Sequence, residues 1–142
     1  MGTWDTGPFD NDSAADWCGD LDDAKPADRP ALIRRAFTAL LDQGDEYLDS
    51  DFAVEAIAAA AVVVSVLPGG TKLTTPYAPD FLLAGGTVEV AADVPALAIA
   101  ALDRIVGDES EWRDLWEDSE SFSGALDSVR ELREALERAA DG

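Results

Sequence analysis

The sequence predicts an all-α protein, a single compact bundle of roughly five to seven helices with one long connection rich in proline and glycine. Apolar residues recur every three or four positions along most of the chain, which is the spacing of one face of an α-helix. Proline and glycine fall near the expected ends of these segments. An alanine-rich run occupies the middle of the chain, as expected for a helix packed on several sides.

The length of 142 residues is typical of one domain and allows an independent core. We expect residues 1–142 to form a single domain, with an N-terminal arm over residues 1–10 and a long loop over residues 68–86. That loop holds three prolines and four glycines, too many helix breakers for a regular element. Loops of this length in compact domains are often functional; the alternative is a packed loop anchored by Tyr77 and Phe81.

Two amphipathic helices are expected in the first third of the chain. The first follows an N-cap among Asp10, Asn11 and Asp12 and ends before Lys25. The second begins near Asp28 and ends near Gly44. Their predicted core residues follow helical spacing and are Ala14, Trp17, Cys18 and Leu21, then Ile33, Ala36, Phe37, Leu40 and Leu41.

The third helix is expected to start from Asp49 or Asp51 and to include residues 52–66. This segment is apolar on nearly every side, which predicts a central helix with several neighbours. Its alanines allow close approach of those neighbours. Valines at positions 62, 63, 64 and 66 make a strand the alternative, but uninterrupted continuation from an alanine run favours a helix.

The second half of the chain predicts a short extended piece over residues 87–90 and three more helices. Asp93 is the expected N-cap of a helix that ends at Gly107. Asp108 and Glu111 have capping-box spacing before a short helix. Predicted inward residues are Ala98, Ala101, Leu102 and Ile105, then Trp112, Leu115 and Trp116, then Phe122, Ala125, Val129, Leu132, Leu136 and Ala139, with Arg130–Glu134 and Glu134–Arg138 pairs outside the last helix.

The chain carries 30 acidic and 10 basic residues, a formal net charge of −20 at pH 7. Nucleic acid is not an expected ligand, because phosphate backbones are bound by clustered Lys and Arg, which are scattered here. An anionic membrane surface is disfavoured likewise. The acidity serves either a basic protein partner or solvation. Solvation is the simpler explanation, since Asp exceeds Glu and Arg exceeds Lys, a bias typical of GC-rich genomes or of life in high salt.

Cysteine usage and hydropathy bear on the compartment. One cysteine allows no internal disulfide, which indicates a reduced, cytoplasmic protein. The N-terminus lacks the basic and then apolar pattern of a secretion signal. The longest apolar run, residues 56–64, is far shorter than the roughly 20 residues that a membrane helix requires. We therefore expect a soluble protein without a membrane partner.

The residue types leave few routes to catalysis. The chain has no histidine, which removes the commonest general base and zinc ligand. Cys18 lies on the apolar face of the first helix among acidic neighbours, which favours a buried, inert thiol. The glycine pairs at positions 69–70 and 85–86 lack the spacing of a phosphate-binding loop. No cofactor is expected, and we predict a protein that is not an enzyme.

Carboxylates are the only abundant reactive groups, and Asp10, Asp12 and Asp16 are the best cluster for a hard cation such as Mg²⁺ or Ca²⁺. Their spacing begins like a calcium loop, but Ala15 and Leu21 stand where glycine and glutamate are required. Helix capping explains these aspartates more simply. A carboxylate- or metal-dependent hydrolase remains the alternative class.

The N-terminal segment contains a pattern of aromatic and polar residues, Trp4, Gly7, Phe9, Asn11 and Asp12. It resembles the start of the bacterial domain-of-unknown-function family 4259 (DUF4259), whose members open with Trp-Gly-x-Gly-x-Phe-x-Asn-Asp. Asp5 departs from this pattern, because the family usually has glycine there. The resemblance extends over nearly the whole chain and implies a common fold but no activity.

From these observations we predict a non-catalytic acidic binding protein, of the inhibitor or immunity type, for a basic protein partner. The candidate partner-binding residues are Trp4, Phe9, Asn11, Asp12 and Asp16, since aromatic residues are enriched among interface hot spots. The structural alternative places Trp4 in a groove between helices, with the arm packed back on the bundle. A salt-adapted helical domain without such a partner is the other alternative.

Overall fold

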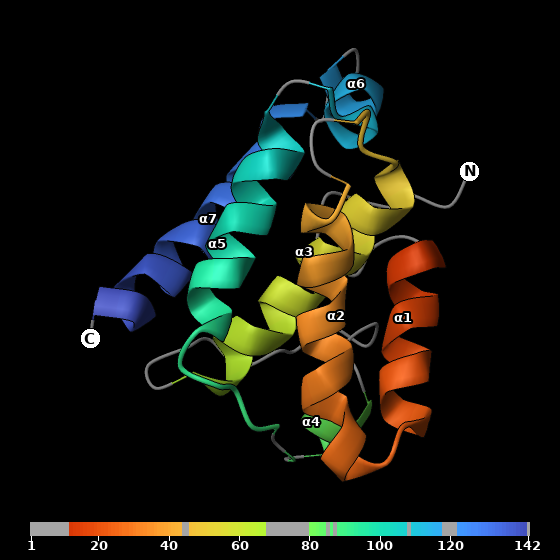
Figure 1. Ribbon diagram of the computed structural model, residues 1–142, viewed down its shortest axis with the longest axis vertical. Coiled ribbons are helices and arrows are strands. Elements are labelled where there is room, and N and C mark those ends of the chain that lie inside the picture. The colour runs from red at the N-terminus through yellow and green to blue at the C-terminus, as the bar shows by residue number, and fades with distance from the viewer. Residues whose placement is uncertain are drawn as a thin grey trace.

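The computed structural model describes residues 12–43, 46–67, 80–84, 86, 88–107, 109–117 and 122–141. Over these residues the protein is an all-α bundle without strands, which confirms the predicted fold class (Figure 1). Its elements are α1 (Asp12–Asp23), the 3₁₀ helix η1 (Pro26–Asp28), α2 (Arg29–Leu41), α3 (Ser50–Val66), α4 (Asp80–Leu83), α5 (Val94–Val106), α6 (Glu111–Glu117) and α7 (Phe122–Asp141).

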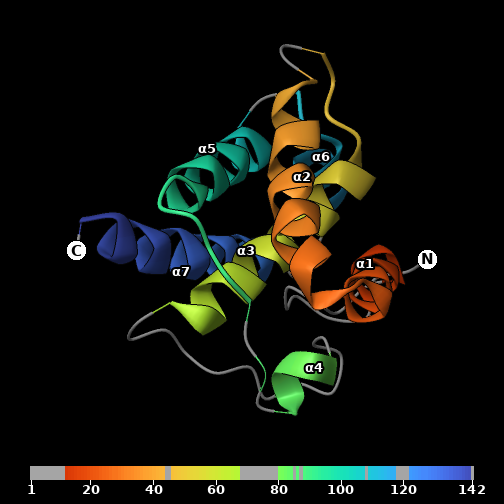
Figure 2. The ribbon, with the colours of Figure 1, turned by 60° about the horizontal axis from the view of Figure 1, so that its bottom comes forward.

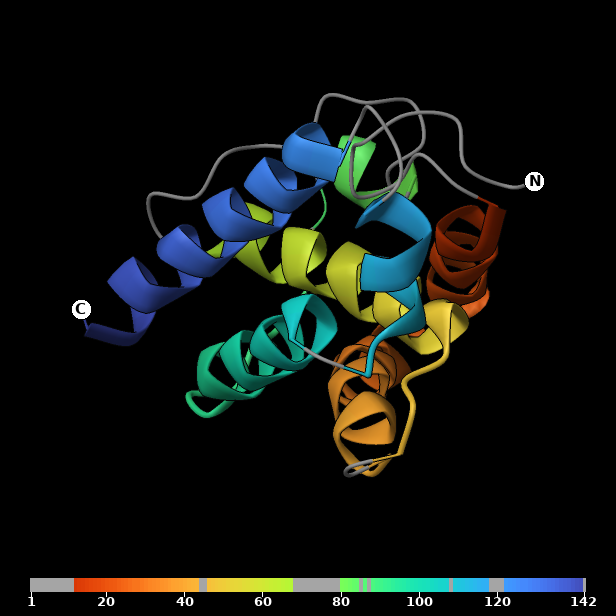
Figure 3. The ribbon, with the colours of Figure 1, turned by 90° about the horizontal axis from the view of Figure 1, so that it is seen from above.

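Helix α3 is the centre of the bundle. It contacts α1, α2, α5, α6 and α7. Figures 1 and 3 place α1 on one side of α3 and the pair α5 and α7 on the other. Residues 58–60 are alanines without solvent exposure, and such small side chains let the surrounding helices approach closely. The predicted central helix is confirmed, and the alternative of a strand over its valines is wrong.

The two N-terminal helices follow the predicted pattern. The core residues expected in α1 are all buried, and so are those expected in α2 except Leu41, which is half-buried. Pro30 lies in the first turn of α2, as its fixed φ favours. Helix α2 ends at Leu41, and Gly44, its predicted end, lies outside the described residues.

The two long C-terminal helices, α5 and α7, pack on each other and on α3. The predicted inward residues of α5 are buried, as are Ala125, Val129 and Leu136 of α7. Trp112 of α6 is buried and contacts Trp116, with ring centroids 6.4 Å apart. The expected ion pairs of α7 are wrong: in the structure Arg130 approaches Asp127, and Arg133 pairs with Glu137. The side chains of Leu115, Phe122 and Ala139 lie outside the described part.

The two connections in the middle of the chain are described only in part. Residues 88–90, from the extended piece expected over residues 87–90, belong to no helix or strand, so that piece stays a prediction. The predicted loop over residues 68–86 contains a single helical turn, α4, which is held at the C-terminal end of α1 (Figure 2). The Asp22 carboxylate accepts hydrogen bonds from the backbone N–H groups of Asp80 and Phe81, at 2.9 and 3.1 Å. A tertiary contact therefore supplies the N-terminal cap of α4, and local sequence gives no signal for it.

A backbone contact fixes α6 to the start of α3. The Leu48 N–H donates to the Glu109 carbonyl at 2.7 Å, and the Glu111 N–H donates to the Leu48 carbonyl at 2.8 Å. At the first turn of α3, the Asp49 side chain accepts from the Asp51 N–H at 2.8 Å, so Asp49, one of the two expected starting residues, is the N-cap. The Glu111 carboxylate accepts from the Ser50 N–H at 2.9 Å. Glu111, the glutamate of the predicted capping box, thus caps α3, although it belongs to α6.

Candidate functional site

The predicted partner-binding residues fall mostly before the described part of the chain. Trp4, Phe9 and Asn11 lie outside the described residues. Asp12 is the first residue of α1, and its side chain is not described. Asp16 is exposed on α1. The candidate site is therefore built outward from Asp16.

Helix α1 presents an acidic stripe. Asp16, Asp20 and Asp23 are exposed, and their spacing of four and then three residues places them on one face of the helix. The opposite face carries the buried residues that pack on α3, among them Trp17 and Leu21. Burial of the apolar face fixes the rotation of α1, so the acidic stripe necessarily points to solvent.

The first two turns of α3 extend this acidic surface. The Ser13 hydroxyl donates to the Asp51 carboxylate at 3.1 Å, which ties the start of α3 to α1. Partial burial, with the nearby charges of Asp51 and Asp20, raises the pKa of Glu55. Carboxylates from the two helices thus share one electrostatic environment. We name Asp16, Asp20, Asp23, Asp51 and Glu55 together the α1–α3 acidic face.

No cation neutralises this face within the described part of the chain. The ion pairs there are Arg34–Asp93, Arg130–Asp127, Arg133–Asp103 and Arg133–Glu137, and none includes a carboxylate of the face. Arg29, the arginine that follows α1, donates instead to the Leu21 and Asp22 carbonyls, both at 2.9 Å. Its guanidinium also lies over the Phe81 ring, 3.9 Å from the centroid. The charge of Arg29 therefore caps the end of α1.

The thiol of α1 is not a nucleophile. Cys18 is buried on the face of α1 opposite the acidic stripe. Burial, with the charge of Asp22 as a second cause, raises its pKa to about 12. A thiol with that pKa is protonated at neutral pH, and the thiolate is the reactive form. Cys18 is therefore part of the core, as predicted.

The structure describes only part of the aspartate cluster considered for metal binding. Asp10 lies outside the described residues, and the Asp12 side chain is not described, so their arrangement with Asp16 stays a prediction. Over the residues that the structure describes, no group of three or more Asp, Glu, Cys or His side chains is placed to hold a metal ion.

Sequence reasoning missed most of the acidic face. It included Asp16 in the candidate site but not Asp20, Asp23, Asp51 or Glu55. The spacing of the three aspartates on α1 was a readable signal, because positions 16, 20 and 23 share one side of a helix. The contribution of α3 was not readable, since it depends on how α1 crosses α3.

The fold and this face define a small, strongly acidic, all-α protein. Residues 2–128 match the family described as Domain of unknown function (DUF4259), and the chain belongs to this family. No curated protein and no solved structure matches the chain. In the described residues, none of the helices has the length and apolar character needed to cross a membrane. The family description supplies no activity, so the function is inferred from the site.

Proposed function

We propose that this protein is a non-catalytic acidic binding protein that docks a basic protein partner on the α1–α3 acidic face and inhibits or masks it. The observation that carries the proposal is the proximity of carboxylates from two helices, Asp20 of α1 and Asp51 and Glu55 of α3, which form no ion pair with a cation of the described residues. Lysine or arginine from a partner would relieve this repulsion. Such complementarity accelerates association and favours partners of opposite charge.

The predicted residues before α1 add an apolar component to this interface. Trp4 and Phe9 precede the acidic stripe in the sequence, with Asn11 and Asp12 between them and the body of α1. A charged rim around aromatic anchors is the usual composition of a specific protein interface. We propose that the aromatic residues supply affinity and that the carboxylates supply association rate and selectivity.

The decisive experiment is a pull-down from native-host lysate at low salt with matched double variants. Asp16→Asn/Asp20→Asn removes two charges from the acidic face, and Glu131→Gln/Glu134→Gln removes two exposed charges from α7. We expect one stoichiometric basic partner to be retained by wild type and by the α7 variant and lost from the α1 variant. Purified, that partner should lose its own activity upon binding.

Three outcomes contradict the proposal. Equal retention by both double variants means that net charge, and not this face, captures the protein. No stoichiometric partner at low salt favours a salt-adapted domain without an acidic-surface partner. Binding of Mg²⁺ or Ca²⁺ tighter than about 1 mM by calorimetry, abolished by Asp16→Asn, favours a metal-dependent role instead.

A further inference from the structure

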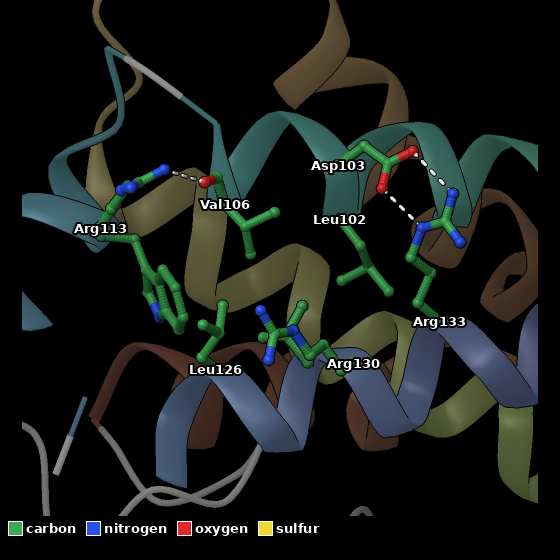
Figure 4. A pocket seen from close by; sticks show the side chains of 9 residues that line it. Leu102, Asp103, Val106, Arg113, Leu126, Arg130 and Arg133 are labelled. Atoms are coloured by element: carbon green, nitrogen blue, oxygen red, sulfur yellow. Dashed lines mark hydrogen bonds and ion pairs between the residues drawn. The ribbon is translucent and has the colours of Figure 1, made fainter. Parts of the chain in front are cut away.

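A cavity of roughly 210 Å³ lies between α5, α6 and α7 (Figure 4). Its apolar wall is formed by Leu102 and Val106 of α5, Trp112 of α6, and Leu126 and Val129 of α7. Leu102, Trp112 and Val129 are buried, so the wall is part of the fixed packing of the bundle. The cavity is thus separate from the α1–α3 acidic face.

The residues that line this cavity include more basic than acidic side chains, in contrast to the whole molecule. Arg113, Arg130 and Arg133 line it, against one carboxylate, Asp103. These are three of the ten basic residues in a chain with a net charge of −20. The cavity therefore combines an apolar wall with a guanidinium rim.

The three arginines differ in how far their charges are already used. Arg133 is bound by Asp103, at 2.6 Å from its Nε, and by Glu137. Arg113 donates to the Val106 carbonyl at 2.7 Å and makes no ion pair with a described carboxylate. Among the described residues Arg130 has one ion-pair contact, with Asp127 at 3.9 Å, and its side chain is 65% exposed. Figure 4 shows Arg130 over the middle of the cavity, with Arg113 and Arg133 toward its ends.

We propose that this cavity binds a small organic monocarboxylate whose carboxylate pairs with Arg130 and whose apolar body lies on Trp112, Leu126 and Val129. The planar guanidinium matches a carboxylate in a two-point contact. A dry cavity of about 150 Å³ is known to accept benzene, so roughly 210 Å³ suits an aromatic ring with a carboxylate or a short branched chain. At about 0.15 M salt the screening length is about 8 Å, so carboxylates far from the cavity repel the ligand only weakly, whereas Arg130 would contact it directly.

The test uses benzoate, its neutral isostere benzamide, and acetate, which lacks the apolar body. Calorimetry at physiological ionic strength should give one benzoate site with a Kd on the order of 1 mM or tighter. Benzamide and acetate should each bind at least about tenfold more weakly, because each lacks one of the two contacts. In nitrogen–proton correlation spectra, benzoate should shift the indole N–H signal of Trp112, assigned with Trp112→Phe.

Matched arginine variants on α7 test the role of the rim. Arg130→Ala should weaken benzoate binding about tenfold, whereas Arg138→Ala, an exposed arginine of the same helix outside the cavity, should leave it unchanged. Both changes are on exposed side chains and should leave the fold intact, as circular dichroism will show. The proposal is overturned by equal affinity for benzoate and benzamide, by absence of binding in the millimolar range, or by an equal effect of the two variants.

Discussion

At the scale of single residues, three arginines satisfy backbone carbonyls. Arg29 binds the last carbonyls of α1, Arg113 the end of α5, and Arg104 the carbonyls of Glu46 and Glu109. Cations near a helix C-terminus also interact favourably with the helix dipole. Because few basic residues are available and several are used in this way, the carboxylates of the α1–α3 acidic face form no ion pair within the described part of the chain. The acidity of the α1–α3 acidic face thus follows from where the arginines are used.

Glu55 is a residue whose ionisation opposes folding. Its pKa is raised in the folded protein, so folding favours the neutral form, and stability falls as pH rises through the folded pKa. Asp51 also lies four residues before it on the same helix, a spacing that is destabilising for like charges. We predict that Glu55→Gln raises the free energy of unfolding at pH 7 by about 0.5 kcal/mol. Urea unfolding measures this difference.

The pH dependence of this gain distinguishes its cause. Below about pH 4, where Glu55 is protonated in both states, wild type and Glu55→Gln should have the same stability. Glu131→Gln, at an exposed site on α7, is the control and should show little change at either pH. A gain for Glu55→Gln that persists at low pH would mean that the amide itself packs better.

Local residue patterns predicted where a helix begins better than they predicted which residues its side chains contact. Asp93 precedes α5, as predicted, but its side chain does not cap that helix. Instead, Arg34 donates two hydrogen bonds to the Asp93 carboxylate, at 2.6 and 2.8 Å. Capping propensity concerns neighbours in sequence, whereas Arg34 is 59 positions away. Such contacts depend on the packing of α2 beside α5, which no sequence window contains.

At the scale of elements, Glu111 connects α6 to α3. Its carboxylate accepts from the Ser50 N–H, which lowers the pKa of Glu111. This contact stabilises the fold above the ordinary pKa of glutamate and is lost as pH falls through the lowered value. We predict that Glu111→Ala costs about 1 kcal/mol of stability at pH 7, the usual effect of losing a helix cap. Chemical denaturation will measure it.

A control on the same helix isolates the cap. Glu117→Ala removes an equal charge from an exposed position at the end of α6. It should change the stability by much less than Glu111→Ala. The deficit of Glu111→Ala should shrink below about pH 4, since protonation weakens the wild-type contact as well. Equal effects of the two variants would exclude capping of α3 by Glu111.

Helix α4 depends on its contacts with α1 and Arg29. A helix of one turn has little stability of its own, because nucleation is unfavourable. We predict that Asp22→Ala, which removes the acceptor for the Asp80 and Phe81 N–H groups, speeds hydrogen exchange of these amides about tenfold. Amides of the buried α3 helix should be unaffected. Asp23→Ala is the neighbouring control, and an equal effect of both would contradict the capping role.

Whether a helix is defined by its own residue pattern or by contacts with other helices explains which elements could be predicted from the sequence. Helix α3 was predictable because a long apolar run without helix breakers admits few alternatives. Helices α1, α5 and α7 were predictable from their periodic apolar faces. Helix α4 was not, since four residues between proline and glycine have no period and its cap comes from α1. For the same reason the acidic face was predicted only at Asp16, on the element whose rotation the sequence determines.

At the scale of the whole molecule, a net charge of −20 opposes the compact state by self-repulsion. Raising KCl from about 10 mM to 1 M shortens the screening length from about 30 to about 3 Å. We predict that the thermal unfolding midpoint of the wild type rises over this range. Calorimetry or circular dichroism across a KCl series will measure the rise.

The two double variants proposed for the pull-down also test where on the surface the repulsion between carboxylates is concentrated. Asp16 and Asp20 are four residues apart on α1, and Asp20 also raises the pKa of Glu55. Asp16→Asn/Asp20→Asn should therefore unfold about 1–2 °C above wild type at low salt, with a smaller salt dependence. Glu131→Gln/Glu134→Gln removes two exposed charges from α7, outside the α1–α3 acidic face, and should show a smaller gain than the α1 variant. Both variants change the net charge equally and share all general salt effects. Identical curves of unfolding midpoint against KCl for the two variants would mean that repulsion is spread over the surface. A larger gain for the α1 variant would place the repulsion on the α1–α3 acidic face.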